Sequence, residues 1–147
     1  MRSAEDDEQF ARIGNELVDG IAAVLDGWLI GAVTRFRPEL AEQAAAAAAD
    51  GAPAVIAELR ELVDLDLDEQ PTTPLTVLRR AVSIPTAVLS AAGVEPPRRD
   101  PFDVTAFPED LYGLTPAAFT DVDGSLGGLG IRWGAAKAHV HLSRRRR

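Results

Sequence analysis

The stretch that decides the fold is Gln9–Arg37, with the sequence QFARIGNELVDGIAAVLDGWLIGAVTRFR. Apolar residues recur along it at steps of 3, 4, 4, 3 and 4, which is the period of one helix face; they are Phe10, Ile13, Leu17, Ile21, Val24 and Trp28. A second apolar stripe lies beside the first and comprises Val18, Ala22, Leu25, Leu29 and Val33. So broad an apolar arc is typical of a helix that is covered on several sides. We therefore expect this helix to occupy the centre of a bundle and to end before Pro38.

Two further helices are expected to follow, separated by a break. Pro38-Glu39 predicts a helix start, because proline fits the first turn, and the helix is expected to run through the alanine tract 44–49. The sequence Asp50-Gly51-Ala52-Pro53 is expected to interrupt the chain, because proline removes a backbone donor from a helix interior. A separate helix is then expected over 54–65.

A fourth helix is predicted to begin after the proline-rich boundary at residues 70–74. Thr73 is a good N-cap residue and Pro74 suits the first helical position. Gly93 is expected to follow the last helical turn as the residue with left-handed backbone. Pro85 either kinks this helix or, with Ser83 as a second cap, restarts it.

The last third of the chain has a different composition. Residues 94–128 are rich in proline and glycine and are expected to be irregular with short helices. A C-terminal helix is expected over 129–142, followed by a basic tail over 143–147. Residues 135–142 also alternate as an edge strand would, but the chain offers no convincing partner strand, so we favour helix. The predicted fold is mostly α: one domain, with a bundle of about four helices over 9–93 and the Pro/Gly-rich segment packed across it.

Composition favours a cytoplasmic protein. Cysteine is absent, so disulfides and thiolate metal sites are excluded. The first eight residues carry four acidic side chains, which is the opposite of a secretory leader. The uncharged run Ala81–Val94 is too short for a membrane helix and contains Pro85, so no membrane contact is expected.

Charge is divided unevenly along the chain. Residues 1–70 carry sixteen Asp or Glu against five Arg, whereas residues 71–147 carry seven against ten Lys or Arg. The two parts therefore have net charges of −11 and +3, which sum to the −8 of the whole chain. Such polarity predicts an acidic surface together with a cationic arm that seeks an anion.

Three motifs resemble catalytic or metal sites. Asp121-Val122-Asp123-Gly124 is similar to the first motif of haloacid-dehalogenase-type phosphatases, but the strand before it and the large domain after it are missing, so capping or Asx-turn roles are expected. Asp64–Glu69 matches the first ligands of a calcium loop but lacks its glycine and distal Glu, so a solvated acidic helix end is expected. The side chains of His139 and His141 would point in the same direction on a strand but not on a helix. Because we expect a helix here, we expect no metal site.

Four glycines, at 124, 127, 128 and 130, precede two basic residues. Their spacing fits neither the dinucleotide-binding pattern nor the P-loop. We therefore expect a flexible connection that tucks Trp133 into place, rather than a phosphate-binding turn.

The leading functional hypothesis is a non-enzymatic interaction or regulatory protein with no cofactor. The residues expected to bind a partner are Arg144, Arg145, Arg146 and Arg147 together with Arg132 and Trp133. One alternative is a small enzyme or metal-dependent hydrolase that uses the C-terminal Asp and His residues. The other is a weak, sequence-independent nucleic-acid binder, for which Arg79, Arg80, Arg98, Arg99 and Arg132 would have to share a face with the tail.

Two expectations concern contacts within and between molecules. The pair Arg79-Arg80 is expected to meet acidic residues of the first half as structural ion pairs. The broad apolar arc of the first helix is expected to need more cover than short alanine-rich helices supply, which predicts a homodimer held mainly by apolar surface.

The second half of the chain resembles an uncharacterised family of short actinobacterial proteins. The resemblance rests on the runs 73–82, 85–89, 92–94, 100–103, 107–116 and 133–138. It implies a bacterial, cytoplasmic setting and transfers no functional residue.

Overall fold

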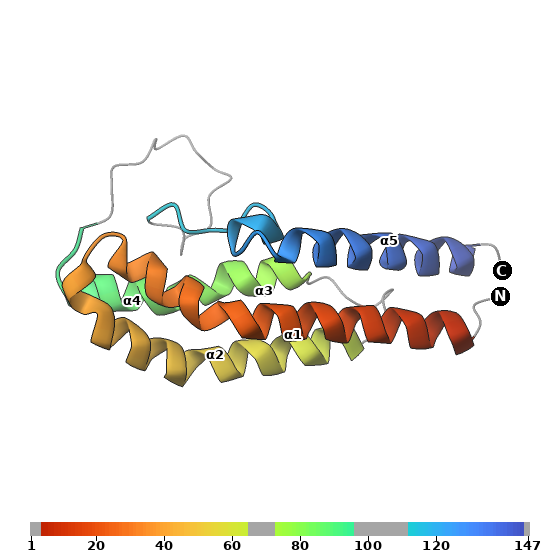
Figure 1. The fold of residues 1–147 in the computed structure, drawn as a ribbon, viewed down its shortest axis with the longest axis horizontal. Coiled ribbons are helices and arrows are strands. Elements are labelled where there is room, and N and C mark those ends of the chain that lie inside the picture. Colours follow the sequence, from red (N-terminus) through yellow and green to blue (C-terminus); the bar gives the residue numbers. More distant parts are fainter. Residues whose placement is uncertain (1–3, 65–72, 96–111, 146–147) are drawn as a thin grey trace.

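The computed structural model describes residues 4–64, 73–95 and 112–145, with the side chains of 4, 5, 64, 141 and 143–145 excepted. In chain order the elements are α1 (Ala4–Thr34), the 3₁₀ turn η1 (Pro38–Leu40), α2 (Ala41–Asp64), α3 (Pro74–Ala81), α4 (Ser83–Ala91), the 3₁₀ turn η3 (Phe119–Asp121) and α5 (Leu126–Arg145). The described residues contain no strand, so the predicted mostly α fold is confirmed. Figure 1 shows α1 between α2 on one side and α5 on the other, with both termini at the same end.

The core is built on α1, as its sequence predicts. Leu17, Ile21, Leu25, Leu29 and Val33 are almost completely buried. One cluster joins α1 to α2, α3 and α5, and a smaller one at the other end of the molecule joins it to α2, α4 and the stretch around Tyr112. Much of the apolar arc of α1 is thus covered within one molecule, whereas Ala22 is exposed and Phe10, Val24 and Trp28 are only partly buried. Self-association stays a prediction.

Residues Asp6–Thr34 of α1 are also long and apolar enough to cross a membrane, judged by length and composition alone. The expectation of no membrane helix rested on the run Ala81–Val94 and did not take this segment into account. The central helix of a bundle meets the same two criteria, and Leu17, Ile21 and Leu25 lie against other helices of the bundle. The burial of α1 therefore accounts for its apolar composition.

The predicted break at Asp50–Pro53 is wrong, because α2 continues through Pro53. Its buried stripe keeps helical spacing across that point: Ala44, Ala48, Ala52, Val55, Leu59 and Leu62. Pro53 itself lies outside this stripe and is exposed. Burial of a continuous stripe against α1 outweighs the local cost of proline, which is about 3 kcal/mol in a helix interior.

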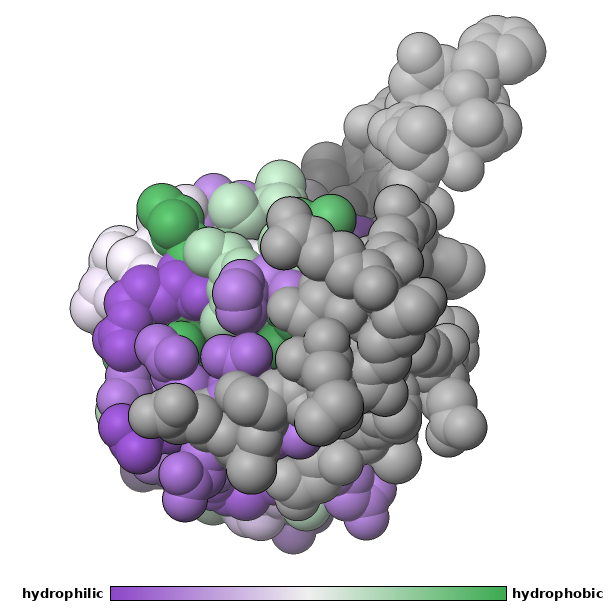
Figure 2. All heavy atoms as spheres, turned by 90° about the vertical axis from the view of Figure 1, so that its right-hand side faces the viewer, coloured by the Kyte–Doolittle hydropathy of each residue, from purple (hydrophilic) through white to green (hydrophobic). Residues whose placement is uncertain are grey.

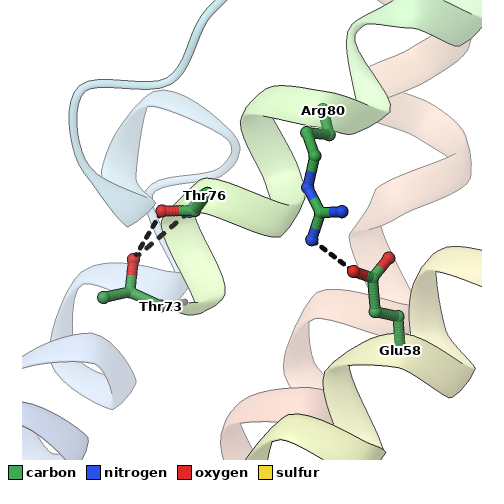
Figure 3. A network of polar contacts seen from close by, with 4 residues as sticks. All are labelled: Glu58, Thr73, Thr76 and Arg80. Carbon is green, nitrogen blue, oxygen red and sulfur yellow. Dashed lines mark hydrogen bonds and ion pairs between the residues drawn. The ribbon is translucent and has the colours of Figure 1, made fainter. Parts of the chain in front are cut away.

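The predicted fourth helix is two helices. Thr73 caps α3, accepting a hydrogen bond from the Thr76 backbone N–H at 3.3 Å (Figure 3). Pro85 permits a restart at Ser83, although the N-cap of α4 is Val82 and no side chain caps it. Gly93, at φ +78°, ends α4 as predicted. The Val94 N–H binds the Leu89 carbonyl and the Gly93 N–H binds that of Ser90, both at 3.0 Å, which is a Schellman motif.

The C-terminal segment is a helix, not a strand. Helix α5 begins at Leu126, three residues before the predicted boundary. The predicted flexible glycine connection is therefore wrong, because Gly127, Gly128 and Gly130 lie inside α5. A Cβ at Gly130 would come within 2.3 Å of the Phe119 ring, and one at Gly127 within 2.7 Å of Thr120. These glycines allow η3 to pack directly on the first turns of α5. Residues 96–111 of the predicted irregular segment lie outside the described residues.

Candidate functional site

The inner face of α5 fixes the helix to the core. Leu126, Trp133 and Val140, spaced by seven, are 0%, 6% and 3% exposed. The Trp133 ring lies 6.3 Å from that of Phe10, and the Lys137 ammonium lies 5.0 Å from its centroid on the outside. Trp133 is therefore a core residue. Its burial corrects the prediction that Trp133 contributes to a partner-binding surface. Its Nε1–H is buried without a hydrogen-bond partner.

The opposite side of α5 is apolar as well, and it faces solvent. Ile131 is 75% exposed and Leu142 is 54% exposed. Between them Ala135 and Ala138 are exposed too. The spacings of 4, 3 and 4 place these four residues on one helix face, opposite Trp133. We call Ile131, Ala135, Ala138 and Leu142 the outer face of α5.

Sequence reasoning missed this face. The signal was present, because two apolar stripes run along α5, one through Trp133 and one through Ile131. In the sequence, only the size of the residues distinguishes the stripe that is buried from the one that is exposed. The stripe with the larger side chain, Trp133, is the buried one.

All charged side chains of α5 are basic. The helix sequence contains Arg132, Lys137, Arg144 and Arg145 and no acidic residue. Arg132 pairs with Glu16 of α1 at 2.9 Å, and His139 Nε2 lies 3.7 Å from an Asp6 carboxylate oxygen. The Arg132 and His139 side chains both remain more than half exposed. Arg144 and Arg145 end α5 without described side chains, and Arg146 and Arg147 lie outside the described residues.

The end of the molecule that carries the termini is mainly polar on the outside. Figure 2 shows hydrophilic residues over most of the coloured surface there, with separate apolar patches among them. Apolar groups on this surface are therefore set in a polar surround, as they are at an interaction surface.

Arg80 pairs with Glu58 of α2 (Figure 3), an acidic residue of the first half, as predicted. The Arg79 Nε–H donates to the Pro116 carbonyl at 3.1 Å. Arg132 pairs with Glu16 of α1. Within the described residues, Arg79, Arg80 and Arg132 therefore do not gather on one nucleic-acid-binding face. Arg98 and Arg99 lie outside the described residues.

The candidate catalytic aspartates have structural roles. The Asp121 carboxylate accepts hydrogen bonds from the backbone N–H groups of Ala117 and Ala118 at 2.8 and 2.9 Å. The Asp123 carboxylate accepts one from the Ser125 N–H at 2.9 Å, which closes an Asx turn ahead of α5. The expected capping and turn roles are thus confirmed. One of the short helices expected within residues 94–128 is η3.

Asp121 and Asp123 do not share a pocket with His139, which instead lines a cavity together with Asp6 and Arg132. Asp121 and Asp123 precede α5, whereas His139 lies thirteen residues beyond its first residue, roughly 20 Å along the helix. Among the described residues no group of three His, Asp or Glu side chains is arranged to hold a metal ion. Of the calcium-like run, residues 65–69 lie outside the described part of the chain, and the side chain of His141 is not described either.

The Asx turn supplies a test of this local geometry. Two hydrogen bonds hold the pKa of Asp123 below the ordinary 3.8. The larger effect comes from the Ser125 hydroxyl and the smaller one from the Ser125 backbone N–H. We expect Ser125→Ala to raise the pKa of Asp123, because the hydroxyl bond is lost. The turn's contribution to stability is present above the unfolded pKa and lost as pH falls through the lower, folded value. Carboxyl NMR titration measures the shift, and an unchanged pKa of Asp123 in Ser125→Ala contradicts the geometry.

A second apolar surface lies between α2 and α4. It is a groove of about 690 Å³. Its lining includes Ala47, Gly51, Ile84, Ala87, Val88 and Ala91, with Asp50 on the α2 side. We call it the α2/α4 groove. Sequence reasoning missed it, because it depends on the angle at which α4 restarts beside α2.

No protein-family model, curated protein or solved structure matches this chain.

Proposed function

We propose that the chain is a non-enzymatic interaction or regulatory protein that binds a protein partner through the outer face of α5. The observation that carries the proposal is the exposure of Ile131 and Leu142 on one face with Ala135 and Ala138. Single exposed apolar residues are ordinary, but an aligned set at helical spacing is the pattern by which helices recognise one another.

Charge supports the same surface. Arg132 lies beside the outer face, Arg144 and Arg145 end the same helix, and Arg146 and Arg147 follow them in the sequence. Cations around an apolar strip favour an anionic partner, because opposite charges steer the encounter and set its orientation. Trp133 contributes from the inside, since its burial holds α5 in place on α1.

The alternatives have less support. The hydrolase alternative needs carboxylates and histidines around one cavity, whereas Asp121 and Asp123 are occupied by backbone N–H groups. The nucleic-acid alternative needs the arginines on one face, whereas Arg80 and Arg132 pair with acidic residues on different elements.

A cytoplasmic setting is part of the proposal. It is favoured by the absence of cysteine and by the burial of the apolar side of α1. Membership of the actinobacterial family that the second half resembles is likewise a proposal.

The test is site-specific photo-crosslinking in the native host. A photoreactive phenylalanine analogue at Ala138 is expected to capture a defined protein. The double substitution Ile131→Glu with Leu142→Glu is expected to reduce that capture about tenfold or more, because two charges would be buried in the contact.

The matched control is Ala11→Glu with Ala23→Glu, which adds the same charge at exposed positions of α1. Capture by this control should equal that of the unsubstituted protein. Equal capture by the α5 variant, with its helix content intact by circular dichroism, contradicts the proposal.

A further inference from the structure

The outer face of α5 and the α2/α4 groove are similar in length and are both rich in small residues. The outer face of α5 spans eleven residue steps from Ile131 to Leu142, roughly 16 Å. The α2/α4 groove runs along the nine residues of α4, roughly 13 Å. Its walls are built largely of small residues, among them Ala47, Ala87 and Ala91. Small residues on both sides let two helices approach to the 8–10 Å separation of packed helices.

The two surfaces are complementary in charge. Helix α5 carries only basic charges. The charged residues of η1 and of the part of α2 that lines the groove are Glu39, Glu42 and Asp50, all acidic, and α4 carries none. Arg37, just before η1, pairs with Glu39 at 4.0 Å and reduces but does not reverse this polarity.

We propose that the outer face of α5 in one copy docks into the α2/α4 groove of a second copy. This inference rests on the proposed function, because it names the partner of the same surface. The contact is between molecules, since α1 separates α5 from α2 within one molecule (Figure 1). Because the two surfaces differ, the contact is heterologous, and each copy offers one helix and one groove to its neighbours.

Other occupants fit the outer face less well. A second α5 would bring two helices with only basic charges together, which opposes a symmetric α5 pair. An anionic membrane calls for a broad face of bulky apolar residues, whereas only Ile131 and Leu142 on this face are large, and Trp133 is buried. The small alanines at the centre of the face suit a close helix neighbour instead.

The test uses two variants that each lose one surface. Ile131→Glu with Leu142→Glu removes the helix surface and keeps the groove. Ala87→Arg with Ala91→Arg fills the groove with two cations at exposed positions of α4 and keeps the helix surface. Light scattering and analytical ultracentrifugation measure the mass of each, with circular dichroism to verify folding.

The full chain is expected to form oligomers whose mass grows with concentration. Each variant alone is expected to be monomeric at concentrations where the unsubstituted chain associates, an apparent loss of affinity of about tenfold or more. An equimolar mixture of the two is expected to give dimers and nothing larger, because one intact helix then meets one intact groove. Higher ionic strength should weaken the contact without abolishing it.

Several outcomes overturn the inference. They are a full chain that is monomeric at every concentration, a variant that still forms oligomers, or a mixture that stays monomeric. Binding of the full chain to phosphatidylserine vesicles, lost in the α5 variant, would assign the face to a membrane instead. If crosslinking from Ala138 captures a different protein and the groove variant captures it equally well, the proposed function stands and self-docking fails.

Discussion

Replacement of Trp133 by alanine is expected to lower the free energy of unfolding by about 3–5 kcal/mol. The indole is 6% exposed and packs beside Phe10 in the main core, so its removal leaves a cavity between α1 and α5. Chemical denaturation followed by far-ultraviolet circular dichroism measures the loss. The expected result is a lower midpoint with loss of α5 packing, because Trp133 lies midway along the inner face of that helix.

The conservative variant Trp133→Phe separates ring packing from polarity. It keeps an aromatic ring in the core and removes the Nε1–H, which is buried without a partner. Leaving such a donor unsatisfied costs about 1–3 kcal/mol, which offsets part of the packing lost with the smaller ring. Trp133→Phe should therefore retain most of the stability that Trp133→Ala loses. If Trp133→Ala instead keeps its stability within about 0.5 kcal/mol and loses only partner capture, the ring belongs to the interaction surface.

The helices that the sequence predicted well are those whose periodic pattern is also their buried pattern. The stripe from Ile13 through Leu17 and Ile21 is the stripe that the bundle covers. Thr73 and Gly93 were predictable for a similar reason, because a cap and a left-handed residue are set by local backbone chemistry. Local rules suffice where the tertiary structure does not oppose them.

One prediction failed where neighbouring elements in the fold decide the local structure. Gly127 and Gly130 suggested a flexible connection, but η3 packs so closely on them that a side chain would collide with Thr120 or Phe119. The hydrogen bond from Arg79 to the Pro116 carbonyl, thirty-seven residues away, is likewise a contact that the sequence does not predict. Such contacts depend on how the helices are placed, and the composition of each segment says nothing of that.

The charge split along the chain is not a split between two faces. Glu16 of the acidic half pairs with Arg132 of the basic half, and Glu58 pairs with Arg80. Asp19 pairs with Arg60 within the acidic half, at 2.5 Å. All these side chains are about half exposed, so each pair contributes no more than about 1 kcal/mol. Apart from these pairs, a basic α5 lies beside an acidic α1, and the acidic α2 lies on the other side of α1.

Replacement of Pro53 by alanine is expected to raise the free energy of unfolding by about 1–3 kcal/mol. Proline in a helix interior costs about 3 kcal/mol relative to alanine, because it removes a backbone hydrogen bond and its ring crowds the preceding turn. Part of the gain is offset, since proline also restricts the unfolded chain, by about 0.4–1 kcal/mol. Pro53 lies inside α2 with its side chain exposed, so alanine loses little packing there. Urea denaturation with an unchanged m-value measures the gain.

The control is Pro85→Ala, which makes the same chemical change in a different setting. Pro85 is the third residue of α4, where a backbone N–H has no partner within that helix, and its ring is buried. Alanine there gains no hydrogen bond of α4 and loses apolar contact, so stability should stay the same or fall. If Pro53→Ala raises the free energy of unfolding and Pro85→Ala lowers it, the cost of Pro53 arises from the backbone of an uninterrupted α2. A loss of stability in Pro53→Ala would mean that proline is needed at this point, and that α2 is two helices joined at Asp50–Pro53, as the sequence alone predicts.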